Sequence, residues 1–311
     1  MIYTVKGPIL KEKLGLTLGH EHFKWEGNEE YANQMYFDKK YNDEDIKTSH
    51  EMILPVLKEL YQLSCRAIVE TSPPIGGQNV KLLKQLSIDS GIHIIPCTGY
   101  NVPSHIYDMF RETFVTQVSK KWISDFEEGL DTIDETIIRP GYIKLLLDKG
   151  NLSHHDQALL KAAVIASKKT GMPIHCHILE HKMVYEVIEL LEKENADLSK
   201  FLWAHADQDG HQETIKFAYD KGIWIGFDMI QVGTYDKKME YILQAIKEGH
   251  QDRILLSQDY EIYDEVVKNG DNHKCTSFFK SFIPYCEERG FSKDVFIDMM
   301  TKNPAEFYDV K

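Results

Sequence analysis

The residues with the clearest chemical potential in this chain are two histidines near its start, within Gly19-His20-Glu21-His22. Side chains alternate between the two faces of a β-strand, so a strand that ends here directs His20 and His22 to the same side. Two converging imidazoles supply half of a metal site. The other half must come from later segments of the chain.

Further candidate ligands stand at the ends of later strand-like apolar runs. His175 and His177 lie near the end of one run, His205 ends the next, and Asp228 and Asp259 end two more. A lone histidine in a strand is more often a hydrogen-bonded core residue than a ligand, and His177 fits that interpretation or a supporting role beside His175. Asp259 alone could be a helix N-cap. The recurrence of the whole set at strand ends favours a metal site.

Lys144 lies in an otherwise apolar run, Tyr142-Ile143-Lys144-Leu145-Leu146-Leu147. A charged lysine in such a strand is costly unless it is paired or neutralised. Three interpretations follow: a buried salt bridge, for example to Asp148, a Schiff-base lysine, or a carbamate that bridges two cations. With the histidines and Asp259 at hand, we favour the carbamate, N6-carboxylysine.

Eight short β-rich runs alternate with helical patterns and would position these residues. The expected strands are 15–20, 67–72, 92–98, 141–147, 172–178, 201–205, 223–228 and 254–259. This alternation, in 311 residues without a composition break, predicts one (β/α)8 (TIM) barrel domain over 1–311. A doubly wound sheet is the rival, but no glycine-rich phosphate loop follows the first strand.

Helical spacing and end signals predict the helices between these strands. We expect helices over 115–129, 154–170, 180–194 and 211–221. For the helix over 154–170, a capping box at Ser153 and Asp156 marks the start, and Gly171 follows the end. Near the end, Asn303-Pro304 predicts a helix start.

Composition excludes several classes of function. With 36 basic and 49 acidic residues the net charge is −13, which disfavours nucleic acid and anionic membrane surfaces as partners. No run approaches the roughly 20 apolar residues of a membrane helix, and the start has no secretory signal pattern. Five scattered cysteines without a CxxC motif fit reduced thiols. We expect a cytoplasmic protein that acts on a small molecule.

The charges of such a site predict a hydrolytic mechanism. Two divalent ions about 3.5–4 Å apart share a bridging water and lower its pKa towards neutrality. The hydroxide attacks a carbonyl or phosphoryl centre, one metal polarises the substrate oxygen, and Asp259 takes the proton. Imidazole and oxygen ligands suit zinc, with manganese, cobalt or iron as alternatives.

The pattern resembles the phosphotriesterase-like family of the amidohydrolase superfamily over essentially the whole chain. The matching pieces are Gly19-His20-Glu21-His22, Lys144, His175, Ala204-His205-Ala206-Asp207, Gly226-Phe227-Asp228, Ser257-Gln258-Asp259 and Asn303-Pro304-Ala305. The resemblance implies that His20, His22 and Asp259 bind a buried metal ion and that His175 and His205 bind a more exposed one. Carboxylated Lys144 would bridge the two ions. Barrels of this family often form homodimers.

The resemblance also bears on the substrate. Met229 follows Asp228 where the family's phosphotriesterases carry a histidine, and Gln208 stands where they carry an acid. These two differences argue against the outward proton relay of those enzymes in this chain. Thr98-Gly99-Tyr100 resembles the lactonase members, in which a catalytic tyrosine leans over the metals, although a rim-packing role for Tyr100 fits equally.

Polar, partly basic loops follow the seventh and eighth strands and favour a sugar lactone, which could carry a phosphate. Besides Asp228, the candidate substrate contacts there are Lys237, Lys238, His273 and Lys274, although a solvated surface would also explain these basic residues. Phosphotriester, phosphodiester or carboxylic ester hydrolysis are alternatives on the same site. A Schiff-base lyase that uses Lys144 is the alternative from a different class of enzyme. A binding protein without catalysis would keep the fold but lack some of the metal ligands, and it is disfavoured because every expected metal-ligand position is filled here.

Overall fold

The computed structural model describes residues 1–25, 41–100, 104–147, 150–270 and 272–311, and it shows strands and helices in alternation. The strands are β1 (Ile2–Thr4), β2 (Gly7–Ile9), β3 (Thr17–Glu21), β4 (Ala67–Glu70), β5 (His93–Ile95), β6 (Cys97–Tyr100), β7 (Asp131–Ile133), β8 (Thr136–Ile138), β9 (Tyr142–Leu146), β10 (Ile174–His177), β11 (Phe201–Ala204), β12 (Trp224–Phe227) and β13 (Ile254–Leu256). All eight expected strands are confirmed, the third of them as two pieces, β5 and β6.

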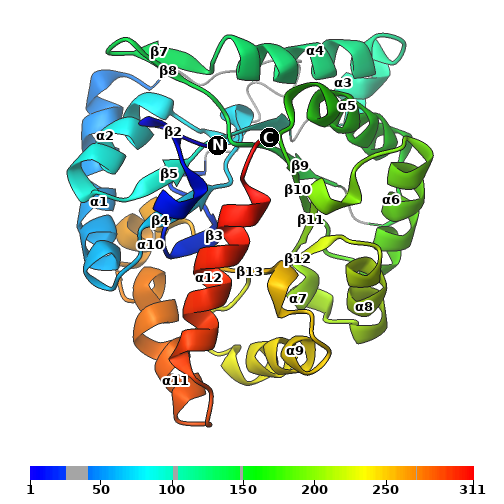
Figure 1. Cartoon of the computed structure of the whole chain (residues 1–311). Coiled ribbons are helices and arrows are strands. Elements are labelled where there is room, and N and C mark those ends of the chain that lie inside the picture. Colours follow the sequence, from blue (N-terminus) through cyan, green and yellow to red (C-terminus); the bar gives the residue numbers. More distant parts are fainter. Residues whose placement is uncertain (26–40, 101–103, 148–149, 271) are drawn as a thin grey trace.

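The helices surround the strands in Figure 1. They are α1 (Asp43–Gln62), α2 (Val80–Ser90), α3 (Ser104–Phe110), α4 (Phe114–Glu127), α5 (His154–Thr170), α6 (His181–Lys193), α7 (Ala206–Asp209), α8 (Gln212–Asp220), α9 (Tyr235–Lys247), α10 (Ile262–Asn269), α11 (Ile283–Glu287) and α12 (Lys293–Phe307). The four helices expected from spacing are confirmed to within two residues at each end. The capping box of Ser153 and Asp156 and the left-handed Gly171 after α5 are present.

The helix start expected at Asn303-Pro304 is wrong. The last helix, α12, begins ten residues earlier at Lys293 and continues through Pro304 to Phe307. Its buried face carries Phe296 and Phe307, so packing outweighs the local end signal. The Asn303 amide does not cap a helix, because it donates to the carbonyls of Gln251 and Ile254, at 2.7 Å each.

The central strands form two parallel sheets. One has the order β13-β12-β11-β10-β9-β6 and the other the order β3-β4-β5. Pro96 separates β5 from β6 and has no amide hydrogen to continue a ladder. At the opposite edges, the Asp259 amide donates to the His20 carbonyl at 3.2 Å and the His22 amide to the Tyr260 carbonyl at 3.0 Å. The expected parallel α/β fold is confirmed.

Alternate residues of these strands enter two apolar clusters. Ile68 and Ile143 belong to the larger cluster between strands and helices, whereas Val69 and Tyr142 belong to a smaller one with Tyr308. Lys144 lies two residues after Tyr142, so it continues the face of the smaller cluster towards the carboxyl ends of the strands. The polar residues of interest therefore follow the smaller cluster along the same face.

Close packing joins the first and last of these strands. A Cβ added at Gly19 would lie 3.2 Å from the Leu255 Cβ and 3.4 Å from the Leu256 carbonyl oxygen. The glycine before His20 therefore lets β3 approach β13. Helix α12 crosses in front of the strands in Figure 1, and the two chain ends meet beside it, where the Met1 and Val310 backbones exchange hydrogen bonds of 2.9 and 3.0 Å.

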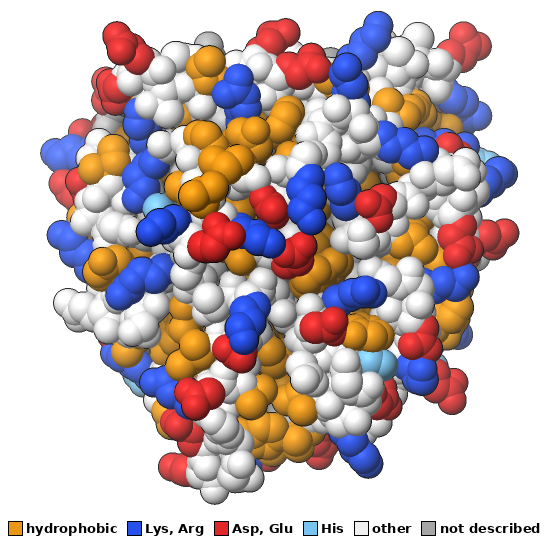
Figure 2. Space-filling view, viewed as in Figure 1, with side chains coloured by type: hydrophobic (Ala, Val, Ile, Leu, Met, Phe, Trp, Pro, Cys, Tyr) orange, Lys and Arg blue, Asp and Glu red, His pale blue; other side chains and the backbone are white. Residues whose placement is uncertain are grey.

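Figure 2 shows this face of the molecule with acidic and basic side chains interspersed among apolar ones, so no basic stripe marks it. The five cysteines are free and buried. No helix in the described ranges has the length and apolar character that a bilayer crossing would need.

Candidate metal centre

Neighbouring strands bring the sequence-predicted residues to one end of the parallel sheets. His175 on β10 is paired in register with Lys144 on β9, and Lys144 is paired with Gly99 on β6. The side chains of Lys144, His175 and His20 are all buried. A Cβ added at Gly99, which has φ +147°, would lie 2.0 Å from the Lys144 carbonyl oxygen. Only glycine therefore lets β6 approach Lys144 so closely.

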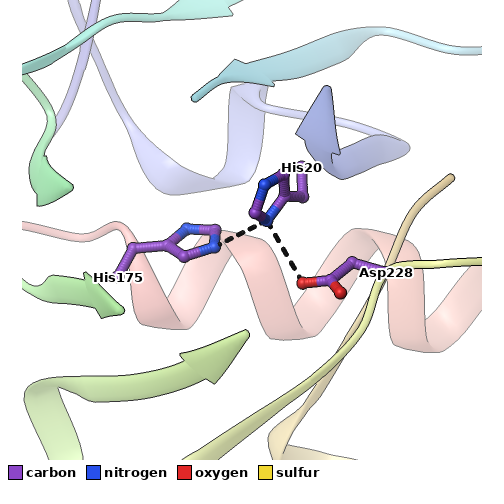
Figure 3. Close-up of side chains that lie close together, drawn as sticks. All are labelled: His20, His175 and Asp228. Atoms are coloured by element: carbon purple, nitrogen blue, oxygen red, sulfur yellow. Dashed lines mark hydrogen bonds and ion pairs between the residues drawn. The ribbon is translucent and has the colours of Figure 1, made fainter. Parts of the chain in front are cut away.

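The base of the site is a buried cluster of His20, His175 and Asp228, drawn in Figure 3. The His20 Nδ1 lies 3.0 Å from the His175 Nε2 and 3.2 Å from the Asp228 Oδ2. The other nitrogen of His175, Nδ1, lies 2.9 Å from the Tyr308 hydroxyl, which comes from the residue after α12. Such an outer contact fixes the tautomer and orientation of an imidazole.

The mouth of the site is formed by His22 and Asp259. The Asp259 Oδ1 lies 3.4 Å from the Nε2 atoms of both His20 and His22, so the two histidines of the motif do converge. The His22 Nδ1 lies 2.8 Å from the Ser72 hydroxyl, just after β4. A register shift between Leu18 and Glu21 places three β3 residues opposite two of β4, an irregularity typical of strands beside functional sites.

Two non-glycine residues of the site adopt left-handed backbone conformations. His205 has φ +65° and Asp259 has φ +55°. Such a conformation costs an L-residue roughly 1–2 kcal/mol. Both follow strands, β11 and β13, and both side chains turn towards Asp228 or the site histidines, which supports a functional reason for the strain.

Burial keeps most of the site histidines neutral. It lowers the pKa of His20 and His175 well below the usual value and that of His22 to about 3. The nearby Lys144 charge lowers all three pKa values further. Neutral imidazoles have the free lone pair that a metal ligand needs. Burial also lowers the pKa of His177 to about 2; its ring packs edge-on against His205 with centroids 4.2 Å apart.

His205 and Asp228 form a tightly coupled buried pair. The His205 Nδ1 lies 2.8 Å from the Asp228 Oδ1, and the His205 amide donates to the same oxygen at 2.9 Å. Burial alone would lower the pKa of His205, but the Asp228 carboxylate outweighs it and raises this pKa. Conversely, the neighbouring His205 and His20 hold the Asp228 pKa well below its usual range despite burial. Asp228 is therefore ionised.

Lys144 lies within this ring of side chains. Its Nζ is 3.2 Å from the His20 Nε2, and burial lowers the pKa of the amine. In the described part of the chain no carboxylate comes within ion-pair distance of this Nζ, and Asp148 lies outside the described residues. A buried amine with a lowered pKa is the nucleophilic form that both the carbamate and the Schiff-base interpretations require.

The donor set fits divalent cations. Two groups hold their ligand atoms within 4.8 Å of one another: His20 with His22 and Asp259, and His20 with His175 and Asp228. The first is the set that the family resemblance implies for the more buried ion, but it is the less buried of the two groups in this structure. The His205 Nε2 is buried and, among the described residues, has no hydrogen-bond partner. An imidazole nitrogen left in this state is a natural cation ligand.

A cavity of about 140 Å³ opens onto these residues. Its described lining joins polar groups of the site to three apolar side chains, namely Trp25, Pro73 and Leu146. The Trp25 ring contacts the His22 ring edge-on at a centroid distance of 5.3 Å. The cavity is therefore small, and its described lining is partly apolar.

The other sequence-predicted substrate residues do not line the described part of this cavity. Lys238 is buried, and its ammonium lies 2.8 Å from the Asp207 carbonyl and 2.9 Å from the Asp207 Oδ2. Lys237 is exposed, with its ammonium 5.6 Å from the Tyr241 ring centroid.

The last two basic candidates also stay away from the cavity. Lys274 pairs with Glu265 at 2.9 Å, and His273 is exposed. The geometry thus gives no support to substrate contact by the four basic candidates, whereas it places Asp228 within the ligand cluster. Tyr100 ends β6, but its side chain lies outside the described residues.

Sequence reasoning missed several residues that support the site. Tyr308 carried no signal, because its partner His175 is 133 residues away in the chain. Ser72 and Trp25 were not singled out either. Glu21 stands between the two histidines of the motif but received no role.

Comparisons with known proteins show the family of this chain and several relatives. Residues 1–308 match the model of the family described as "Phosphotriesterase family". An aryldialkylphosphatase of Saccharolobus solfataricus is 25% identical over 97% of this chain and 98% of its own length. The phosphotriesterase homology protein of Escherichia coli is 25% identical over 94% of this chain and 98% of its own length. An N-acetyltaurine hydrolase of Xenopus tropicalis is 23% identical over 100% and 98%.

Proposed function

This chain belongs to the phosphotriesterase family, and on that premise we propose that it is a binuclear metal-dependent hydrolase that opens a small lactone ring. The observation that carries the proposal is the convergence of four histidines, Asp259 and Lys144 beside one small cavity. A soluble, cytoplasmic location and a homodimer remain predictions.

We propose further that the strands form one closed (β/α)8 barrel and that 1–311 is a single domain. Two features support closure. The β5 strand continues through Pro96 into β6, and backbone hydrogen bonds join β3 to the residues after β13. Both lie where the two parallel sheets would have to meet.

The chain offers two sets of metal ligands on this proposal. His20, His22 and Asp259 would hold one ion, and His175 and His205 the other, with Lys144 between them; zinc is the first candidate. Bound divalent ions supply Lewis acidity and lower the pKa of an attacking water. The Asp259 carboxylate, at the cavity wall, would accept the proton of that water, and Tyr100 would orient the substrate.

Lys144 would act as a carbamate. On this proposal the unprotonated Nζ attacks carbon dioxide, a nitrogen–carbon bond forms and one proton is released, which leaves an anionic group with two oxygen donors. Burial lowers the pKa of this amine, which supports the chemistry. Protein loaded with isotopically labelled bicarbonate should show a carbamate resonance that is absent from Lys144→Ala.

The cavity favours a small substrate. At about 140 Å³ its described part is well below the ~300–1,000 Å³ of pockets for drug-sized ligands. Among the described lining residues Lys144 is the only basic group apart from the histidines, so we propose an uncharged lactone rather than a phosphorylated one. A carboxylic amide is the second candidate, because relatives of similar identity are named N-acetyltaurine hydrolases.

A substrate panel on zinc-reconstituted protein tests these proposals. It should contain simple and sugar lactones, phosphorylated aldonolactones, an aryl dialkyl phosphate and N-acetyltaurine. We expect the largest kcat/KM for an uncharged lactone and no turnover after chelation. Faster turnover of N-acetyltaurine than of every lactone would replace the lactone proposal with the amide one.

A further inference from the structure

The middle residue of the histidine motif, Glu21, has a fully buried carboxylate that contacts no cation among the described residues. Instead it accepts hydrogen bonds from the turn that follows β13. Its Oε1 accepts from the Ser257 hydroxyl at 2.8 Å and from the Gln258 amide at 2.9 Å, and its Oε2 accepts from the Tyr260 amide at 3.0 Å. We call residues 257–260 the Asp259 turn.

The three donors surround one residue of the site. Gln258 and Tyr260 are the immediate neighbours of Asp259, which has the left-handed φ of +55°. A strained conformation persists only where its surroundings fix it. The carboxylate of Glu21 fixes the amide on each side of Asp259 and so holds that carboxylate towards His20 and His22.

Ser257 extends the contact back to β3. Its hydroxyl donates to Glu21 and accepts from the His20 amide at 2.9 Å. The bonds therefore form a closed path from the backbone of His20, through Ser257, to the side chain of the next residue. These side-chain bonds add to the backbone hydrogen bonds that join His20 to Asp259 and His22 to Tyr260.

We propose that Glu21 is a positioning residue, which sets Asp259 against the two histidines and thereby sets the affinity of the site for a divalent ion. This inference rests on the metal-dependent function proposed above. It assigns Glu21 no contact with substrate or metal. Glutamine is the sharpest replacement, because its NH2 group would face a backbone or hydroxyl donor and one of the hydrogen bonds would be lost.

The first test measures the turn itself in metal-free protein. Amide hydrogen exchange of residues 257–260 should accelerate in Glu21→Gln relative to wild type, while exchange in α5 stays unchanged. This readout does not require the protein to bind metal. Unchanged exchange in the turn would overturn the inference even if the enzyme proves to be a hydrolase.

The second test is a double-mutant cycle with zinc as the probe, followed by equilibrium dialysis. Glu21→Gln should weaken zinc binding by about 10–100-fold, the usual range for a group that orients a ligand. In an Asp259→Asn background the same substitution should have no further effect, because its action passes through Asp259. Additive losses would overturn the inference, whereas a wild type that binds no zinc would overturn the proposed function instead.

A matched control separates positioning from general destabilisation. Asn303→Ala removes the amide that bonds the carbonyls of Gln251 and Ile254, at the opposite end of β13. It should lower Tm and leave zinc affinity unchanged. If Glu21→Gln fails to fold, Ser257→Ala removes one of the three bonds and should show the same coupling to Asp259 with a smaller loss; the absence of coupling there would also overturn the inference.

Discussion

His175 and Asp228, at the base of the site, are almost fully enclosed, whereas His22 and Asp259, at its mouth, keep 19% and 17% of their side-chain surface exposed. The base is fixed by side chains of paired strands and by Tyr308 after the last helix. The mouth is fixed by Ser72 and by a turn between elements. Ligands at the base therefore depend on the packing of the whole fold, and those at the mouth depend on a few hydrogen bonds.

The substitution His20→Ala should have the largest effect, because His20 contacts residues of both the base and the mouth of the site. It lies within 3.4 Å of His175, Asp228, Lys144 and Asp259. We expect kcat/KM to fall by about a thousandfold or more, since the ion held with His22 and Asp259 loses a ligand and the base loses the side chain that joins it to the mouth. Metal analysis should find at most one ion per chain, with circular dichroism unchanged. A full metal complement would contradict a ligand role for His20.

Tyr308→Phe tests the base alone. It removes the hydroxyl that orients the His175 ring but keeps the apolar ring in the smaller cluster. Loss of such an outer partner typically lowers metal affinity by about 10–100-fold. Zinc titration should show weakening of one site while the His22 and Asp259 site keeps its affinity. Equal weakening of both sites would show that base and mouth are not separable.

His177→Gln tests the pH dependence of the cavity wall, where His177 packs against His205. Burial lowers the pKa of His177 to about 2, far below its unfolded value. The stability that the neutral ring contributes is therefore present above pH 6.5 and is lost as the pH falls, because the unfolded chain takes up a proton that the folded one does not.

Urea unfolding of metal-free protein measures this difference. Between pH 6.5 and 5, wild type should lose up to about 2 kcal/mol more than His177→Gln. Parallel pH profiles for the two proteins would show that His177 is protonated in the fold as easily as in the unfolded chain.

Ser72→Ala should have the smallest effect of the four. The hydroxyl holds the Nδ1 of His22, but that ring also packs against Trp25. We expect zinc affinity at the mouth to fall by about tenfold, the low end for a group beside a ligand. Ser72→Thr keeps a hydroxyl and should restore most of the affinity; a threonine variant as weak as the alanine one would point to a steric rather than a hydrogen-bonding role.

The sequence was sufficient where local patterns and strand ends decide the outcome. Apolar runs located the strands, and the polar residues within or just after them pointed to His175, His205 and Asp259. It was insufficient where distant segments meet, as with Tyr308 and His175, because no local pattern encodes that contact. The basic loop residues stay predictions as substrate contacts, although Lys238 forms a buried pair with Asp207. At Asn303 a strong local end signal was outweighed by tertiary packing along α12.

The left-handed backbone at Asp259 places a catalytic carboxylate at the cost of backbone strain. Glycine adopts this conformation without steric cost, so Asp259→Gly should relax the turn while it removes the acid. An inactive protein that folds at least as well as the natural one would be a practical trap, able to hold an intact substrate long enough for its identity to be read by mass spectrometry.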